Sequence, residues 1–251
     1  MLKTVNLGIQ YGSRKLFQNV NLAFSKGNCY GIIGANGAGK STFLKVLSGE
    51  IESTEGEVLM DPNERMSVLK QDQNAYNDYT AIQTVLMGHK RLMEIQEAKD
   101  KLYQKTDFTD EDGILAAELE GEFAELGGWE AESDAETLLS GLGVDQDYYY
   151  TLMQDLDAKI KIKVLLAQAL FGNPDILLLD EPTRGLDPLG AKEIMELFYD
   201  IHKETGKTII IITHDMNLVY QYATRVVVLN NGILKYDGSK EELFKSNIYK
   251  D

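Results

Sequence analysis

Residues 34–41 read Gly-Ala-Asn-Gly-Ala-Gly-Lys-Ser, and they constrain the fold of this chain more than any other stretch. They match the pattern G-x-x-x-x-G-K-[ST], which is typical of a phosphate-binding loop. The apolar run 29–33 before the loop predicts a buried strand, and residues 42–47 after it have helical spacing that ends at Ser48 and Gly49. The sequence therefore predicts a phosphate site between a strand and a helix.

The residue types in this loop suit a nucleoside triphosphate and its metal ion. Glycines allow successive backbone N–H groups to turn toward phosphates at the positive end of the helix. Lys40 can reach the β- and γ-phosphates, and Ser41 can ligate Mg²⁺. The alternative is a glycine-rich turn with a solvated Lys40, which the flanking strand and helix disfavour. The predicted nucleotide-binding residues of this segment are Gly34, Asn36, Gly37, Ala38, Gly39, Lys40, Ser41 and Thr42.

A pair of carboxylates follows a second apolar run. Residues 176–179 are Ile-Leu-Leu-Leu, which suits a central parallel strand, and Asp180 and Glu181 come directly after them. Asp180 is placed to hold Mg²⁺, usually through water, and Glu181 to polarise the water that attacks the γ-phosphate. The alternative is an ordinary helix cap. We expect that role to fall to Asp187, because Pro188 after it suits the first position of a helix.

Three further side chains are candidates, and each has a common structural alternative. Gln71 follows the predicted strand 66–70, where its amide could reach the metal ion. His214 ends the apolar strand 208–212, at the sheet edge where open α/β sheets bind ligands, and is a candidate γ-phosphate sensor. Tyr11 lies in the turn between two alternating strands within residues 2–24 and could stack on adenine. A lone histidine is usually structural, and a lone tyrosine is more often a packing residue.

The 251 residues allow one large α/β domain or a domain with a subdomain. Cys29 is the only cysteine, which excludes an intrachain disulfide, makes a structural zinc site improbable and fits a cytoplasmic location. No apolar run approaches the roughly 20 residues that span a bilayer, so we expect membrane contact only through a partner.

Acidic residues gather in one segment. Residues 107–158 hold sixteen Asp and Glu and no Lys, Arg or His, within a net charge of −15 for the chain. The rest of the chain is close to neutral, which disfavours broad binding to nucleic acid. The pattern predicts a single domain over 1–251, with a core of residues 1–75 and 160–251 and a helical subdomain over 76–159 that contains this acidic insert.

These motifs, in this order, make the chain similar to the nucleotide-binding domain of the ATP-binding-cassette (ABC) family. The resemblance covers nearly all of the chain. By this resemblance residues 34–41 are the Walker A loop, Gln71 the Q-loop glutamine, Asp180 and Glu181 the end of Walker B with its catalytic glutamate, residues 185–187 the D-loop, His214 the switch histidine and Tyr11 the aromatic residue that stacks on adenine.

The resemblance implies a fold, a reaction and partners. The fold would be an α/β P-loop NTPase, with a mainly parallel sheet covered by helices on both faces, an antiparallel β subdomain and a helical subdomain. The reaction would be Mg²⁺-dependent hydrolysis of ATP to ADP and phosphate. The expected partner is a second ABC cassette, in a homodimer or a heterodimer.

Two branches of the family are represented in one chain. Residues 1–179 resemble the ribosome-associated ABC-F proteins, notably at 69–73, 118–125 and 164–175. Residues 180–251 resemble ATPase subunits of energy-coupling-factor vitamin importers, since ABC-F proteins usually have Asn-His where this chain has Arg184 and Gly185. Either a natural mosaic or an artificial recombinant would give this pattern. The first expectation is a transporter ATPase subunit, peripheral on the inner membrane face through a partner, and the alternative is a soluble translation factor acting on the ribosome.

The signature motif departs from the family. Where the family has Leu-Ser-Gly-Gly-Gln, residues 156–160 are Leu-Asp-Ala-Lys-Ile. In the family this loop closes on the γ-phosphate of the second cassette, so its loss favours low activity in isolation. A third alternative is therefore a regulatory ATP-binding module with weak hydrolysis.

Overall fold

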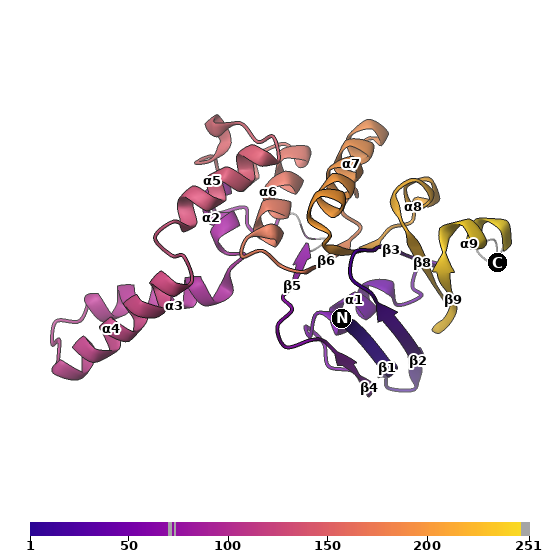
Figure 1. Ribbon diagram of the computed structural model, residues 1–251, viewed down its shortest axis with the longest axis horizontal. Helices are drawn as coiled ribbons and strands as arrows, with labels where there is room; N and C mark the ends of the chain where they lie inside the picture. The colour runs from indigo at the N-terminus through magenta and orange to yellow at the C-terminus, as the bar shows by residue number, and fades with distance from the viewer. Residues whose placement is uncertain (70–71, 73, 247–251) are drawn as a thin grey trace. The chain divides into compact units, whose positions relative to one another are not determined.

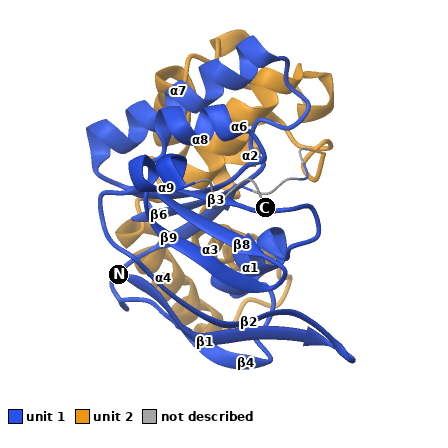
Figure 2. Ribbon diagram, turned by 90° about the vertical axis from the view of Figure 1, so that its right-hand side faces the viewer, with its two compact units in different colours: residues 1–72, 173–251 blue, residues 73–172 orange. Residues whose placement is uncertain are grey.

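The computed structural model describes residues 1–69, 72 and 74–246. By its internal contacts the chain divides into two compact units, which are coloured separately in Figure 2: unit 1 comprises residues 1–72 and 173–251, and unit 2 residues 73–172. Residues from 160 onward were predicted to belong to the core, whereas the helix Ala158–Leu170 belongs to unit 2. The reason is that this apolar helix packs against other helices of the insert, which its own periodicity does not reveal.

The larger sheet of unit 1 has six strands, and only its last strand is antiparallel to its neighbour. Strands β3 (Cys29–Ile33), β6 (Ile176–Asp180) and β7 (Thr208–Ile212) are buried throughout, as expected for continuous apolar runs covered on both faces. The predicted, mainly parallel sheet is confirmed. In spatial order the strands are β5 (Met66–Leu69), β6 (Ile176–Asp180), β7 (Thr208–Ile212), β3 (Cys29–Ile33), β8 (Arg225–Asn230) and β9 (Ile233–Ser239).

A smaller antiparallel sheet forms the predicted β subdomain. It has the order β2 (Arg14–Phe24), β1 (Leu2–Tyr11) and β4 (Glu55–Leu59). Figure 1 shows this sheet beside α1 (Lys40–Leu47). Its apolar side chains share one core with α1 and the larger sheet. Phe17 of β2 and Phe43 of α1 meet edge to face, with 5.6 Å between ring centroids. This packing joins the β1–β2 turn to the element that follows the phosphate-binding loop.

Helices cover both faces of the larger sheet, as the resemblance implied. The face opposite α1 packs on a second apolar cluster with residues of α8 (Met216–Tyr222) and α9 (Lys240–Ser246). The long helix α7 (Pro188–Thr205) buries Ile194 and Phe198. Asp187 caps α7 as predicted, since its Oδ1 accepts a hydrogen bond from the Gly190 N–H at 2.7 Å.

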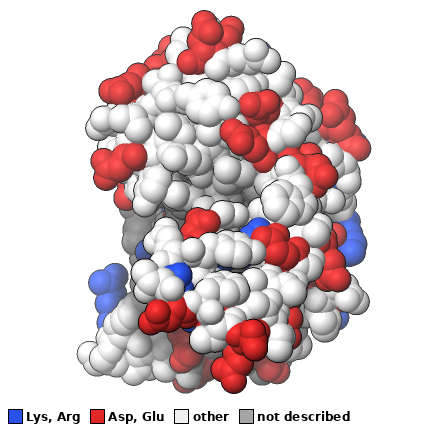
Figure 3. All heavy atoms as spheres, turned by 90° about the vertical axis from the view of Figure 1, so that its left-hand side faces the viewer, with Lys and Arg blue, Asp and Glu red and all other residues white. Residues whose placement is uncertain are grey.

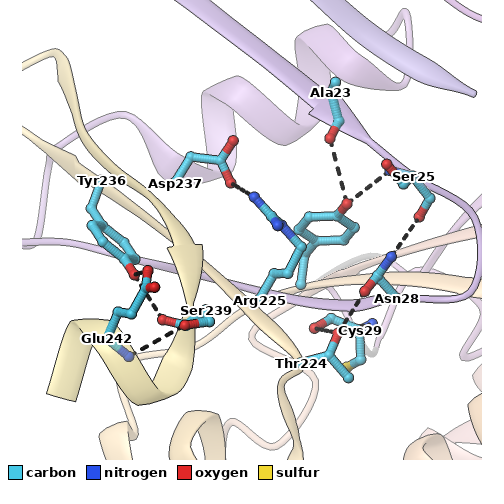
Figure 4. Close-up of polar contacts among 11 residues, drawn as sticks. Ala23, Ser25, Asn28, Cys29, Thr224, Arg225, Tyr236, Asp237, Ser239 and Glu242 are labelled. Atoms are coloured by element: carbon cyan, nitrogen blue, oxygen red, sulfur yellow. Dashed lines mark hydrogen bonds and ion pairs between the residues drawn. The ribbon is translucent and has the colours of Figure 1, made fainter. Parts of the chain in front are cut away.

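Polar contacts fix the beginning of β3 against β8 (Figure 4). The Cys29 N–H donates to Thr224 Oγ1 at 3.0 Å, and the Thr224 N–H donates to the Cys29 carbonyl at 2.8 Å. At the next residue, Arg225 Nη2 donates to Asp237 Oδ1 of β9 at 3.0 Å. Burial raises the pKa of the Cys29 thiol to about 12, so the only cysteine is a packing residue and not a nucleophile.

Unit 2 is helical. Thr80 and Thr109 each begin a helix with a capping box. Basic residues of α3 (Lys90–Tyr103) neutralise part of the acidic insert: Arg91 makes two hydrogen bonds of 2.6 Å to Glu122, and Lys99 Nζ lies 2.9 Å from Glu120 Oε2. The helices are α2 (Ala81–Leu86), α3 (Lys90–Tyr103), α4 (Asp110–Glu125), α5 (Ala131–Gly141) and α6 (Ala158–Leu170), with two 3₁₀ turns at Gln146–Tyr148 and Met153–Asp155.

Acidic side chains predominate over basic ones on the face drawn in Figure 3. This agrees with the acidic composition of residues 107–158. Within the residues that the structure describes, no helix combines the length and the apolar character needed to cross a bilayer.

Candidate functional site

The phosphate-binding loop leaves β3 through a position that only glycine can occupy. Gly34 has φ 153°, and a Cβ added there would lie 1.8 Å from the Leu229 carbonyl oxygen. Gly37 and Gly39 take the left-handed conformation, with φ 77° and 91°. Any other residue would be strained at these two positions, so the glycine spacing in the sequence follows from the path of the backbone.

The amino end of α1 is open to an anion. Gly39 is the N-cap of this helix and has no side chain to accept from the first-turn amides. The first N–H groups of any helix lack partners within it. Here they border the same cavity as the loop, because Gly39, Lys40, Ser41 and Thr42 all line it. A glycine loop that ends in an uncapped helix fits a phosphate group.

Lys40 is a buried cation. The residue is only 5% exposed, and its Nζ donates to the loop carbonyls of Gly34 and Ala35 at 2.8 and 3.0 Å. Burial lowers the pKa of Lys40, and the charges of Glu181 and Asp180 oppose that shift. A buried ammonium group is stabilised by a negative partner, so the position of Lys40 favours the binding of a negatively charged ligand beside it.

Ser41 and Asp180 come from different elements and meet in one hydrogen bond. Ser41 Oγ, on α1, donates to Asp180 Oδ1, at the end of β6, over 3.0 Å. Burial is the main cause that raises the pKa of Asp180, and the hydrogen bond from Ser41 opposes it. Hydroxyl and carboxylate oxygens suit Mg²⁺. Among the described residues no group of three or more His, Cys, Asp or Glu is arranged to hold a metal ion, so a magnesium ion here would also need phosphate oxygens or water.

Glu181 has a fixed backbone and a paired side chain. Its φ of 48° lies in the left-handed region, and its N–H donates to the Ile212 carbonyl of β7 at 3.0 Å. Its Oε1 lies 2.5 Å from His214 Nε2, and its Oε2 lies 3.6 Å from Arg184 Nη1. The end of β6 and the end of β7 thus bring Glu181 and His214 together, although 33 positions separate them in the sequence.

One cavity of about 520 Å³ in unit 1 collects most of the predicted residues. Tyr11 lies at its rim and is 56% exposed. Three predicted residues do not line the cavity: Gly34, Ala38 and Asp180. Asp180 is hydrogen-bonded to Ser41, which does line it. Gln71 lies outside the described residues. The predicted residues that line the cavity are Tyr11, Asn36, Gly37, Gly39, Lys40, Ser41, Thr42, Glu181 and His214.

Sequence reasoning missed three residues that line the cavity: Arg14, Leu16 and Arg184. Arg14 pairs in register with Tyr11 across the β1–β2 hairpin. The signal for Arg14 in the sequence is therefore its place in the same turn as the predicted residue Tyr11. Leu16 offers no sequence signal, because it resembles any apolar strand residue. The signal for Arg184 is its place three residues after Glu181, in a turn whose second residue is Pro182.

The altered signature segment lies in unit 2. Asp157, which stands in the place of the signature serine, is the N-cap of α6, and its Oδ1 accepts from the Ile160 N–H at 2.9 Å. Its carboxylate therefore accepts a hydrogen bond from a first-turn N–H group of its own helix. A serine would cap a helix equally well, so the cap alone does not require an acid here.

Comparison with known proteins identifies relatives of the whole chain. A family model described as "ABC transporter" matches residues 17–184, and one described as an AAA domain matches residues 159–219. A protein of Bacillus subtilis named "Uncharacterized ABC transporter ATP-binding protein YkpA" is 51% identical over 248 residues, which cover 98% of this chain and 45% of the relative. A protein of Escherichia coli named "Probable ATP-binding protein YbiT" is 43% identical, covering 96% of this chain and 45% of YbiT. The chain thus spans less than half the length of these two relatives.

Other similar proteins are closer in length. The energy-coupling factor transporter ATP-binding protein EcfA2 of Bacillus cereus is 32% identical, covering 92% of this chain and 73% of EcfA2. Among solved structures, cbiO1 from Clostridium perfringens, described as part of the ABC transporter complex cbiONQ, has a TM-score of 0.71 at 26% identity, with 98% and 91% of the two chains covered. A nucleotide-free ATP-binding cassette has a TM-score of 0.77 at 24% identity, covering 100% of this chain and 95% of that chain, and shows the shared fold.

Proposed function

Because the chain belongs to the ABC transporter ATP-binding family, we propose that it binds and hydrolyses ATP and serves as the ATPase subunit of a membrane transporter. The observation that carries the enzymatic part is the cavity of unit 1 that the phosphate-binding loop borders. That cavity joins an uncapped glycine loop and a buried lysine, which follow the end of β3, with a paired glutamate at the end of β6. These groups are the ones that phosphoryl transfer to water requires.

Each residue has a separate role in the proposed reaction. Tyr11 stacks on the adenine ring, and the loop amides together with Lys40 hold the phosphates. Ser41 and Asp180 hold Mg²⁺, which when bound neutralises phosphate charge. The proposed part of Gln71 is a further ligand of that ion. Fixed donors and charges of this kind account for much of the catalysis of phosphoryl transfer.

Glu181 is the proposed general base. Its carboxylate accepts a proton from the attacking water while the backbone of the residue stays fixed by the bond to β7. His214 holds one carboxylate oxygen at 2.5 Å and is near enough to the cavity to contact the γ-phosphate as well. Breaking the bond between the γ-phosphate and ADP then needs no covalent intermediate with the protein.

The transporter role rests on the named relatives. EcfA2 and cbiO1 are described as parts of transporters, and both match this chain across residue 180 over more than nine-tenths of its length. We therefore propose a transmembrane subunit and a second cassette as partners, with the chain on the inner face of the membrane. The acidic insert lacks the basic surface that binding to ribosomal RNA needs, so we do not propose the ribosomal alternative.

Two measurements test the proposal. Purified protein should release phosphate from ATP only when Mg²⁺ is present, and the wild-type protein in cell extracts should sediment with membranes and not with ribosomes in the presence of ATP. An absence of ATP binding would contradict the enzymatic part. Sedimentation with ribosomes and not with membranes would contradict the transporter part and leave the ATPase intact.

A further inference from the structure

Residues 181–184 form a tight turn on the wall of the cavity. The Arg184 N–H donates to the Glu181 carbonyl at 3.0 Å, which is the hydrogen bond that closes a β-turn. Pro182 occupies the second position, where its fixed φ favours such turns. Gly185 follows with φ 84°. The sequence Glu-Pro-Thr-Arg-Gly therefore brings the side chains at its first and fourth positions to the same side.

The two oxygens of the Glu181 carboxylate have different partners. His214 Nε2 lies 2.5 Å from Oε1, and Arg184 Nη1 lies 3.6 Å from Oε2. The carboxylate is mostly buried, with 18% of the Glu181 side chain exposed, whereas 67% of the Arg184 side chain is exposed. The terminal torsion of a glutamate has broad preferences, so the partners of its oxygens decide where they point.

We propose that Arg184 is a positioning residue for the hydrolysis of ATP and that it acts through Glu181. This inference rests on the proposed function. The guanidinium holds Oε2, so that the carboxylate keeps one orientation toward the cavity while His214 holds Oε1. Without Arg184 the carboxylate loses the partner that holds Oε2 and turns more freely, so fewer encounters with water are productive. An exposed ion pair contributes little to folding, so the effect belongs to the rate and not to stability.

Arg14 provides a matched control in the same cavity. It also places a guanidinium on the wall, but it lies on β2 in register with Tyr11, on a different element from Glu181. Arg14→Gln and Arg184→Gln each remove one positive charge from the cavity. The loss of Arg14 should weaken the binding of Mg·ATP and raise KM, because a cation that borders a phosphate site acts on the bound ligand. The loss of Arg184 should lower kcat.

The decisive experiment is a double-mutant cycle. Steady-state kcat and KM are measured for the wild type, Arg184→Gln, Arg184→Lys and Arg14→Gln, with the affinity for Mg·ATP determined by titration. We expect Arg184→Gln to lower kcat by roughly ten-fold, within the 10²-fold that a 1 Å displacement can cost, with KM and affinity changed by less than about two-fold. Arg184→Lys should recover part of the loss. In a Glu181→Gln background, single-turnover hydrolysis should fall no further when Arg184→Gln is added.

Three results would overturn the inference. The first is an unchanged kcat in Arg184→Gln, and the second is an equal loss from this substitution with or without the Glu181 carboxylate. The third is a rise in KM like that of Arg14→Gln, which would make Arg184 a binding residue. A wild-type protein that binds ATP but does not hydrolyse it would overturn the proposed function as well, so the two failures are distinguishable.

Discussion

At the scale of single residues, Lys40 carries the strongest prediction for binding. Its ammonium is buried, and its hydrogen bonds go to loop carbonyls that border the cavity. Lys40→Ala should weaken the affinity for Mg·ATP at least about ten-fold, since hydrogen bonds to charged groups contribute about 1.5–3 kcal/mol. Lys45→Ala is the control, because Lys45 lies exposed on the same helix. Titration with Mg·ATP measures the affinity of each variant. Equal affinity of Lys40→Ala and Lys45→Ala would refute the assignment of the phosphate site.

Asp180 should show a conflict between stability and function. Its folded-state pKa is raised mainly by burial, so the ionised form is the disfavoured one in the folded protein. The destabilisation is absent below the ordinary pKa of an aspartate and is fully present above the raised folded-state pKa. At neutral pH and without Mg²⁺ or nucleotide, Asp180→Asn should therefore raise the melting temperature, while Mg²⁺-dependent hydrolysis falls.

The advantage of Asp180→Asn should shrink as the pH is lowered toward the ordinary aspartate pKa, where the wild-type carboxyl is protonated in both states. Thermal unfolding at a series of pH values measures this. A melting temperature below that of the wild type at every pH would show that the carboxylate stabilises the fold, contrary to its buried position.

At the scale of elements, the sequence predicted the strands and helices of unit 1 well because each has a strong local pattern. Apolar runs gave β3, β6 and β7, and the glycine loop gave the junction of β3 with α1. Asp180, Glu181 and His214 lie at strand ends, as predicted. There Asp180 accepts a hydrogen bond from Ser41, and Glu181 contacts His214. Parallel strands bring their carboxyl ends to one edge, so this part of the site follows from the order of motifs.

What the sequence did not reveal depends on contacts between elements or within turns. Whether α6 joins the core or the insert is decided by which apolar faces meet, and its residues would suit either. The pairing of Arg184 with Glu181 depends on the geometry of one turn. The approach of Arg14 to the cavity depends on how the β1–β2 hairpin packs on α1.

The insert offers a test of the helical assignment by glycine replacement. Gly121 lies inside α4, and a Cβ there would meet no atom within 4 Å. Gly121→Ala should therefore stabilise unit 2 by about 0.5–1 kcal/mol, since glycine is a poor helix former. Gly88→Ala is the contrasting variant, because its Cβ would lie 2.0 Å from the Gln168 carbonyl oxygen and should destabilise the same unit. Denaturant unfolding followed by circular dichroism compares them, and destabilisation by both would contradict the structure of α4.

At the scale of the whole molecule, the altered signature segment predicts how the chain associates. By the family resemblance, Asp157 would face a γ-phosphate across a dimer, where two anions would meet. Like charges at an interface cost several kcal/mol, which exceeds the few neutral hydrogen bonds the segment could offer. We expect ATP not to close a homodimer of this chain, in keeping with a second, different cassette as partner.

Light scattering with and without Mg·ATP tests that expectation in a Glu181→Gln background. The unaltered signature segment should leave the chain monomeric. The triple change Asp157→Ser, Ala158→Gly and Lys159→Gly should promote a dimer that depends on ATP. A nucleotide-dependent dimer formed by the unaltered segment would show that residues 156–160 dock differently from the family pattern.

ATP is expected to be hydrolysed in the cavity of unit 1 with Glu181 as the general base. The most direct measurement compares phosphate release and Mg·ATP affinity for the wild type and Glu181→Gln. The amide keeps the size of the side chain but accepts no proton, so turnover should fall on the order of 10²–10⁴-fold. Affinity should stay within a few-fold of the wild type. Hydrolysis at the wild-type rate by Glu181→Gln would contradict the account, because the base would then be another group.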